Sequence, residues 1–129
     1  MNKKRKASNY ERELLSKFHD LGFNGVRVAG SGSSQFPSPD LLVGRKGLIY
    51  AVEVKTSEKE FLHISKKQLS ELLGFCNNLN ILPLVGVKFL NRADWFFLPA
   101  EDLLKSNDNL HVRINETDRD KGFFLDNLN

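Results

Sequence analysis

The 129-residue chain contains one cysteine, Cys76, so it cannot form an internal disulfide bond. Its three histidines are scattered, and with a single cysteine they do not form the Cys/His spacing of a zinc site. No apolar run is long enough to cross a bilayer, and no apolar stretch follows the basic N-terminus as in a secretory signal. We therefore expect an intracellular, cytoplasmic protein that works in a reducing compartment and does not contact a membrane.

Neither sign of charge dominates, because 19 Lys and Arg residues stand against 16 Asp and Glu residues, a formal net charge of +3. The positive residues are nevertheless clustered, at Lys3, Lys4, Arg5 and Lys6 and again at Lys66 and Lys67. Such clusters suit the phosphate backbone of a nucleic acid. Charge alone favours the simpler interpretation, a solubilising N-terminal arm and a solvated helix face.

The order of the predicted elements indicates an α/β fold in one domain, with a mixed β-sheet flanked by helices. Helical spacing and capping residues predict a first helix capped by Ser8 or Asn9, a second capped by Ser65 and a short third one. Apolar alternation and turn residues predict the strands, and the segment 58–64 is expected to be a mobile loop. The helices are expected over 8–22, 65–79 and 99–105, and the strands over 25–29, 40–44, 48–56, 81–89, 93–99 and 109–115.

Three charged residues stand on two strands that are predicted to pair as a hairpin around Lys46 and Gly47. Glu53 and Lys55 are two residues apart and so share one strand face, and Asp40 begins the neighbouring strand after Pro39. Buried charge is costly unless it is paired or bound to a metal. These residues therefore either face the solvent as scattered charges or form a functional site.

Two carboxylates that lie close together suit Mg²⁺, which prefers oxygen ligands and keeps several waters. The backbone carbonyl of Val54 is a further candidate ligand, and Lys55 is suited to orient water or to neutralise phosphoryl charge. Glu11 on the first helix is a candidate additional carboxylate. Small polar residues of the 30–39 loop and an amide on the second helix complete the candidate set: Ser31, Ser33, Ser34 and Gln68. Each has an ordinary alternative as a surface or loop residue.

Pro39-Asp40 followed by Glu53-Val54-Lys55 resembles the PD-(D/E)xK nuclease superfamily. More narrowly, the chain is similar to archaeal-type Holliday junction resolvases in "KRKASNYERELLSKFHDLGF", "VRVAGSGSSQFPSPDLL", "AVEVKTS" and "SKKQLSELLGF". The similarity covers roughly residues 3–100, and the tail over 105–129 matches weakly. It implies a restriction-endonuclease-like fold in one nuclease domain over 1–129, with a basic arm over 1–8.

The resemblance also implies an activity, the metal-dependent cutting of four-way DNA junctions by a homodimer. Mg²⁺ is the implied cofactor, with Mn²⁺ as a possible substitute. Glu11, Asp40 and Glu53 would be metal ligands, Lys55 the catalytic lysine and Ser31 a serine needed for cleavage. The implied DNA-binding residues are Lys3, Lys4, Arg5, Lys6, Arg12, Arg27, Ser33, Lys66 and Gln68.

A dimer needs an apolar surface, and aromatic residues are typical of interface cores. The candidates for that surface are Trp95, Phe96, Phe97, Phe123, Phe124 and Leu125. Three other functions stay open: a nuclease for another DNA structure, a non-catalytic DNA-binding module, and an interaction domain with a charged hairpin.

Overall fold

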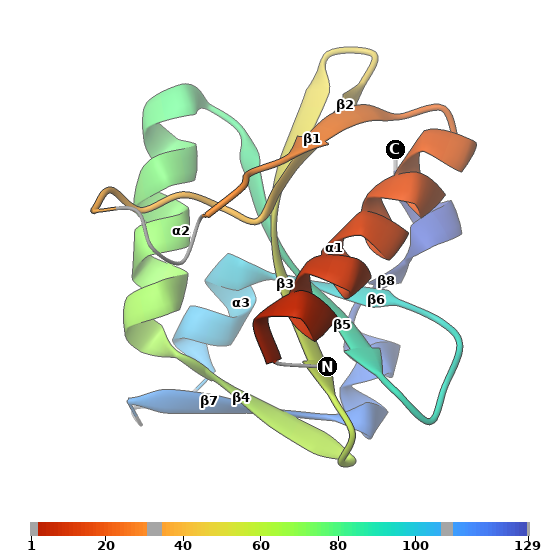
Figure 1. The fold of residues 1–129 in the computed structure, drawn as a ribbon. Coiled ribbons are helices and arrows are strands. Elements are labelled where there is room, and N and C mark those ends of the chain that lie inside the picture. Colours follow the sequence, from red (N-terminus) through yellow and green to blue (C-terminus); the bar gives the residue numbers. More distant parts are fainter. Residues whose placement is uncertain (1–2, 31–34, 107–109, 129) are drawn as a thin grey trace.

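A six-stranded mixed sheet with helices on both faces forms the body of the protein in a computed structural model that describes residues 3–30, 35–106 and 110–128 (Figure 1). The α-helices are α1 (Lys3–Asp20), α2 (Lys66–Leu79) and α3 (Ala100–Lys105), and the 3-10 helices are η2 (Glu116–Lys121) and η3 (Leu125–Asn127). The strands are β1 (Asn24–Arg27), β2 (Leu41–Arg45), β3 (Leu48–Ser57), β4 (Phe61–Ser65), β5 (Leu82–Phe89), β6 (Phe96–Pro99), β7 (His111–Asn115) and β8 (Phe123–Phe124).

The strand order of the large sheet is β1-β2-β3-β5-β6-β8, and β3 and β5 form its one parallel pair. β4 and β7 pair separately as a two-stranded antiparallel sheet. α1 covers one face of the large sheet, and α2 and α3 cover the other (Figure 1). This arrangement confirms the predicted α/β class with a mixed sheet.

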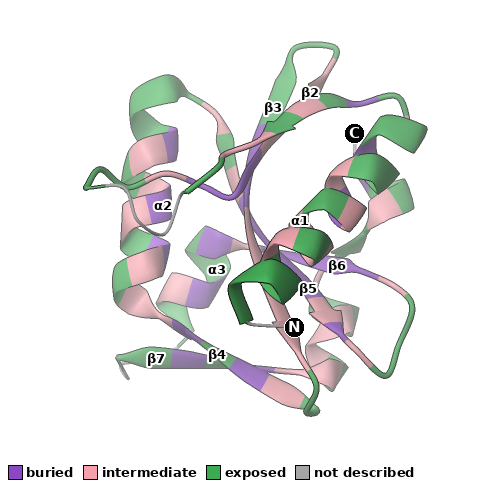
Figure 2. Ribbon diagram, in the orientation of Figure 1, coloured by how far each residue is buried: buried purple, intermediate pink, exposed green. Residues whose placement is uncertain are grey.

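Side chains alternate along β3 and so pack into two separate cores, one on each face of the sheet. Val52 packs beneath α1 with Leu14 and Phe18. Its neighbour Ala51 packs on the opposite face with Leu72 of α2. Figure 2 shows the buried residues gathered on the strands and on the inward sides of the helices. Glu53 is the next residue after Ala51 on the α2 face of β3. The core beneath α2 therefore borders directly on the candidate site.

The hairpin of β2 and β3 forms as predicted. Arg45 pairs with Leu48, which leaves the two-residue turn Lys46-Gly47. Both turn residues have positive φ, 52° and 84°, as a type I′ turn requires. This turn fixes the register, in which Leu41 lies opposite Val52. Asp40 immediately precedes Leu41 in the chain.

Two of the secondary-structure expectations are wrong. α1 begins at Lys3 rather than after Ser8 or Asn9, because Lys, Arg and Ala are good helix formers and continue the helix backwards. The segment 58–64 is not a loop throughout, since β4 begins at Phe61 and pairs with β7. Leu62 and Ile64 of β4 alternate into the core beneath α2. The charged residues that precede them concealed this strand, and its partner lies far along the chain.

Trp95, Phe96 and Phe97 are buried in the monomer, so they do not form the dimer surface for which they were candidates. Trp95 and Phe97 face the α1 core and Phe96 faces the other core. Phe123 and Phe124 of β8 remain exposed. The exposed part of the predicted dimer surface is therefore the one in the C-terminal segment, at Phe123 and Phe124.

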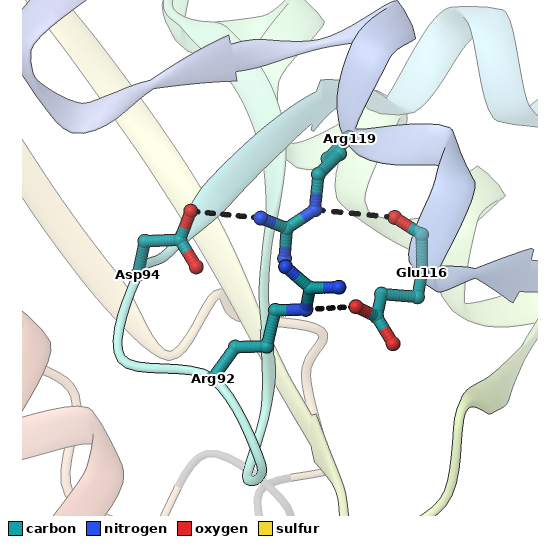
Figure 3. A network of polar contacts seen from close by, with 4 residues as sticks. All are labelled: Arg92, Asp94, Glu116 and Arg119. Carbon is teal, nitrogen blue, oxygen red and sulfur yellow. Dashed lines mark hydrogen bonds and ion pairs between the residues drawn. The ribbon is translucent and has the colours of Figure 1, made fainter.

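Charged residues join the C-terminal segment to the loop between β5 and β6 (Figure 3). Arg119 of η2 donates to Asp94 over 2.9 Å and to the backbone carbonyl of Glu116 over 3.3 Å. Arg92 forms an ion pair with Glu116. Together with the pairing of β8 on β6, these contacts make the weakly matched tail part of the folded sheet.

Gly86 of β5 lies in a tightly packed place between the side chains of neighbouring strands and Leu14 of α1, and this predicts a measurable effect on stability. A Cβ there would lie 3.1 Å from the side chains of Phe97 and Val52 and 3.3 Å from that of Leu14. We expect Gly86→Ala to lower the free energy of unfolding by about 1–3 kcal/mol through overpacking, measured by urea denaturation. Gly74→Ala on α2 is the matched control, since nothing lies within 4 Å of its Cβ, and it should stabilise the helix slightly. An unchanged midpoint for Gly86→Ala would contradict this packing.

Candidate active site

Asp40 is held by backbone hydrogen bonds on both sides as the chain enters β2. Its N–H donates to the carbonyl of Val52 over 3.1 Å, and its carbonyl accepts from Val28 over 2.8 Å. The side-chain Oδ2 accepts a hydrogen bond from the N–H of Val54 over 2.8 Å. The residue is buried, with 9% of its surface exposed. The strand pairing therefore fixes this carboxylate in place.

Glu53 lies against Asp40, and the two side chains share a hydrogen bond. Burial, together with the hydrogen bond and the negative charge of Asp40, raises the pKa of Glu53 to about 9, although Lys55 opposes the shift. At neutral pH, and without a cation, the Glu53 carboxyl therefore holds a proton. A pair of this kind favours a divalent cation, which replaces the proton and removes the repulsion.

Glu11 on α1 is the third predicted carboxylate, and it lies near the pair but is held by a cation. Its Oε1 is 3.2 Å from Nη1 of Arg27 on β1, and both side chains are mostly buried. Burial raises the pKa of Glu11, the charge of Asp40 adds to this, and Arg27 opposes it. Arg27 was predicted to bind phosphate, and here it neutralises Glu11. A role for Glu11 as a metal ligand remains a prediction.

The donor set fits a magnesium site of the open kind. Within the three described ranges, no group of three or more His, Cys, Asp or Glu side chains is arranged to hold a metal ion. Asp40 and Glu53 are two carboxylates in contact, and Mg²⁺ is commonly bound by one or two carboxylates together with waters and phosphate oxygens. The predicted carbonyl ligand, that of Val54, stays a prediction, although the N–H of the same residue anchors Asp40.

A cavity of about 380 Å³ opens between the sheet and α2 and contains the acidic pair. Its walls come from the loop before β2, the two carboxylates and one side of α2: Gln35, Phe36, Pro37, Ser38, Asp40, Glu53, Lys67, Gln68, Glu71 and Leu72. Ser65 caps α2 by accepting from the N–H of Gln68 over 3.1 Å, as predicted. The cap fixes the start of the helix, so the predicted Gln68 faces the cavity.

Seven of these wall residues were not among the sequence candidates for the site: Gln35, Phe36, Pro37, Ser38, Lys67, Glu71 and Leu72. Helical spacing contained a signal for two of them. Lys67 and Glu71 are four residues apart and flank Gln68, so a helix that turns Gln68 toward the site turns them there as well. Phe36 and Ser38 lie in a loop without periodicity, where no pattern indicates direction.

The predicted DNA-binding residues are spread over a wider surface. Lys3, Lys4, Arg5 and Lys6 lie on the first turns of α1, and Lys6 forms an exposed ion pair with Glu58 at 3.7 Å. Arg12 is exposed on the same helix, beside Glu11. Lys66 begins α2, and its N–H donates to the carbonyl of Leu110. Ser31 and Ser33, together with Ser34, lie outside the described residues.

The fold and the acidic pair with Lys55 define the class of the protein, that of the PD-(D/E)xK nucleases. Residues 2–128 match the family described as archaeal Holliday junction resolvase (Hjc). The chain is 34% identical over 109 residues to the crossover junction endodeoxyribonuclease Hjc of Archaeoglobus fulgidus, covering 84% of this chain and 79% of the relative. It is 32% identical over 108 residues to the enzyme Hje of Saccharolobus solfataricus, covering 80% of each.

A solved structure agrees with these relationships. The Hjc structure from Archaeoglobus fulgidus superposes with a TM-score of 0.81 at 30% identity and covers 92% of this chain and 95% of its own. The chain belongs to the archaeal Holliday junction resolvase family. The resemblance inferred from the motifs is thereby confirmed.

The raised pKa of Glu53 predicts how stability depends on pH when no divalent cation is present. The folded state keeps a proton that the unfolded chain releases above its ordinary pKa of 4.5, so stability should fall as the pH rises from 4.5 toward about 9. Glu53→Gln removes this titration and should flatten the profile. Urea midpoints of both proteins in EDTA at pH 5 and pH 8 test it, and two parallel profiles would contradict the assignment. Mg²⁺ should raise the wild-type midpoint at pH 8.

Proposed function

We propose that the protein is a Mg²⁺-dependent endodeoxyribonuclease that resolves four-way DNA junctions by hydrolysing phosphodiester bonds in paired strands. The observation that carries the proposal is the buried contact of Asp40 with Glu53, with Lys55 two residues further along the same strand, in a chain of the resolvase family. The relatives that match over most of their length are named crossover junction endodeoxyribonucleases.

Asp40 and Glu53 would hold the metal ion, and Glu11 would be a further ligand. When bound, the ion would supply an activated water and neutralise charge on the phosphate. Asp40 is anchored by the N–H of Val54, so its carboxylate keeps a fixed direction while DNA binds. Lys55 shares the strand face of Glu53, where its ammonium can hold the attacking water or the charge that develops on the phosphate.

Of the basic residues at the helix starts, Lys67 lines the cavity of the acidic pair and the others lie outside its lining. The N-terminal turns of α1 and the start of α2 carry Lys3, Lys4, Arg5, Lys6, Lys66 and Lys67. Phosphates outside the cleavage site would bind these side chains with release of counterions. No helix among the described residues is long and apolar enough to span a membrane. The proposed substrate is chromosomal or viral DNA inside a cell.

Asp40→Asn separates chemistry from binding and is the main test. We expect it to abolish cleavage of a labelled four-way junction in Mg²⁺, because one metal ligand is lost, while binding in EDTA stays at the wild-type level. Asp102→Asn, which removes an exposed carboxylate on α3, is the matched control and should cut normally. A linear duplex and a splayed duplex are included as substrates. Normal cleavage by Asp40→Asn would contradict the site, and wild-type cleavage of all three substrates would replace the junction activity with a general nuclease.

Two incisions in one junction require two active sites, so we propose a homodimer with twofold symmetry. Leu82 and Phe123 are 46% and 45% exposed and line one largely apolar cavity of about 370 Å³ together with Tyr50 and Pro99. Phe124, the next residue of the edge strand β8, is also exposed but lines a different cavity. A second copy of the chain would cover this apolar surface.

Phe123→Asp tests the dimer. Charge in an apolar interface is costly, so we expect the variant to sediment as a monomer and to make single instead of paired nicks. Leu110→Asp changes a leucine that is 80% exposed elsewhere and should leave the wild-type mass unchanged. A wild-type protein that sediments as a monomer would rule out the dimer, and a dimeric Phe123→Asp protein would place its surface elsewhere.

A further inference from the structure

Phe36 is the most exposed phenylalanine in the described residues, with 69% of its surface accessible. Phe18, Phe23, Phe89, Phe96 and Phe97 are by contrast fully buried or nearly so. Phe36 also lines the cavity that contains Asp40 and Glu53. A large aromatic ring is thus presented to solvent beside the acidic pair, where burial in the core does not account for it.

The backbone around Phe36 restricts where the ring can go. Pro37 follows it directly, and a residue before proline is confined to extended conformations. Pro39 and Asp40 are buried, and Asp40 is fixed by its hydrogen bonds to β1 and β3. Four residues of extended chain span at most about 14 Å, so the ring stays close to the carboxylates. Little conformational freedom remains to be lost when the ring packs on a ligand.

The lining of the cavity combines apolar and polar groups. Phe36, Pro37 and Leu72 are its apolar members, and the charged and amide groups of Asp40, Glu53, Lys67, Gln68 and Glu71 line it as well. The Oγ atom of Ser38 is buried on the same cavity and has no hydrogen-bond partner among the described residues. A ligand that fits this lining has a flat apolar face, polar edges, and a negative charge that meets Lys67 or a cation held by the carboxylates, and a nucleotide has all three.

We propose that Phe36 stacks on a nucleobase that is unstacked at the branch point of the DNA, while the backbone of the same strand lies at Asp40 and Glu53. Aromatic side chains stack on any of the bases, because every base has a π-face. In a linear duplex each base is already stacked on both sides, so the ring gains a partner only where the helix is interrupted. Phe36 would therefore favour branched over linear DNA, and Ser38 and Lys67 would meet the polar edge and the phosphate. This inference rests on the proposed function, whose activity it makes specific.

Photocrosslinking tests the contact directly. Junctions carrying 5-iodouracil at one position at a time, at the branch point or within an arm, are bound by the full-length protein in EDTA and irradiated. We expect a crosslink from a branch-point position to Phe36, identified by mass spectrometry. It should persist in Phe36→Tyr and disappear in Phe36→Leu, which keeps the apolar bulk and loses the π-face. Crosslinks that reach other residues only, or that form equally from arm positions, would overturn the proposal.

Cleavage rates give the second measurement. Phe36→Leu should lower kcat/KM on the junction by about tenfold, as expected for the loss of one base stack, while Phe36→Tyr cuts normally. Ile49→Ala is the matched control, since it alters an exposed apolar residue at the far end of β3 and should cut at the wild-type rate. Wild-type cleavage by Phe36→Leu would overturn the stacking role and leave the nuclease intact. A wild-type protein that does not cut would instead overturn the proposed function, and the crosslink in EDTA would still report on the ring.

Discussion

The contact between the Asp40 and Glu53 carboxylates is the constraint around which the rest of the structure is arranged. It is unfavourable by itself, since two acids in a desolvated place cannot both carry charge. The protein enforces it with backbone pairing, because the register of β2 on β3 sets Asp40 beside Glu53 and the N–H of Val54 holds Asp40 from the side. The repulsion that lowers the stability of the folded protein here is also what favours the binding of a cation by the two carboxyl groups.

The two helices divide the work of supporting that contact. α1 packs closely over β5 at Gly86 and brings Glu11 toward Asp40, where Arg27 of β1 limits the added negative charge. α2 is fixed at its start by the Ser65 cap and lines the cavity opposite the sheet. The site is thus built from one strand pair and two opposed helices. A shift of either helix would change the charge balance at the acids and not merely the packing.

The sequence predicted best the residues whose positions are set by neighbouring residues in the chain. The Lys46-Gly47 turn and the alternation along β3 place Asp40, Glu53 and Lys55, and the Ser65 cap places Gln68, all within local pattern. β4 was missed because its partner, β7, lies far along the chain, and pairing across such a distance leaves no local signal. The aromatic run from Trp95 to Phe97 was a candidate for the dimer surface, and alternation predicted burial for only two of its three residues. All three are buried because this sheet has a core on each face.

The presence of acidic and apolar groups in one cavity bears on how one small domain can distinguish DNA shapes. Phosphate contacts alone position a protein without distinguishing one duplex from another, and the proposed contacts of the basic turns of α1 and α2 would be of that kind. An acidic pair adds chemistry but equally little selectivity, because every phosphodiester presents the same group to a metal. Selectivity for a branch needs a feature that only a branch exposes, such as the face of an unstacked base. An exposed ring tied by four residues to the carboxylate proposed to bind the metal would couple such a feature to cleavage, so that chemistry would be favoured where the helix is interrupted.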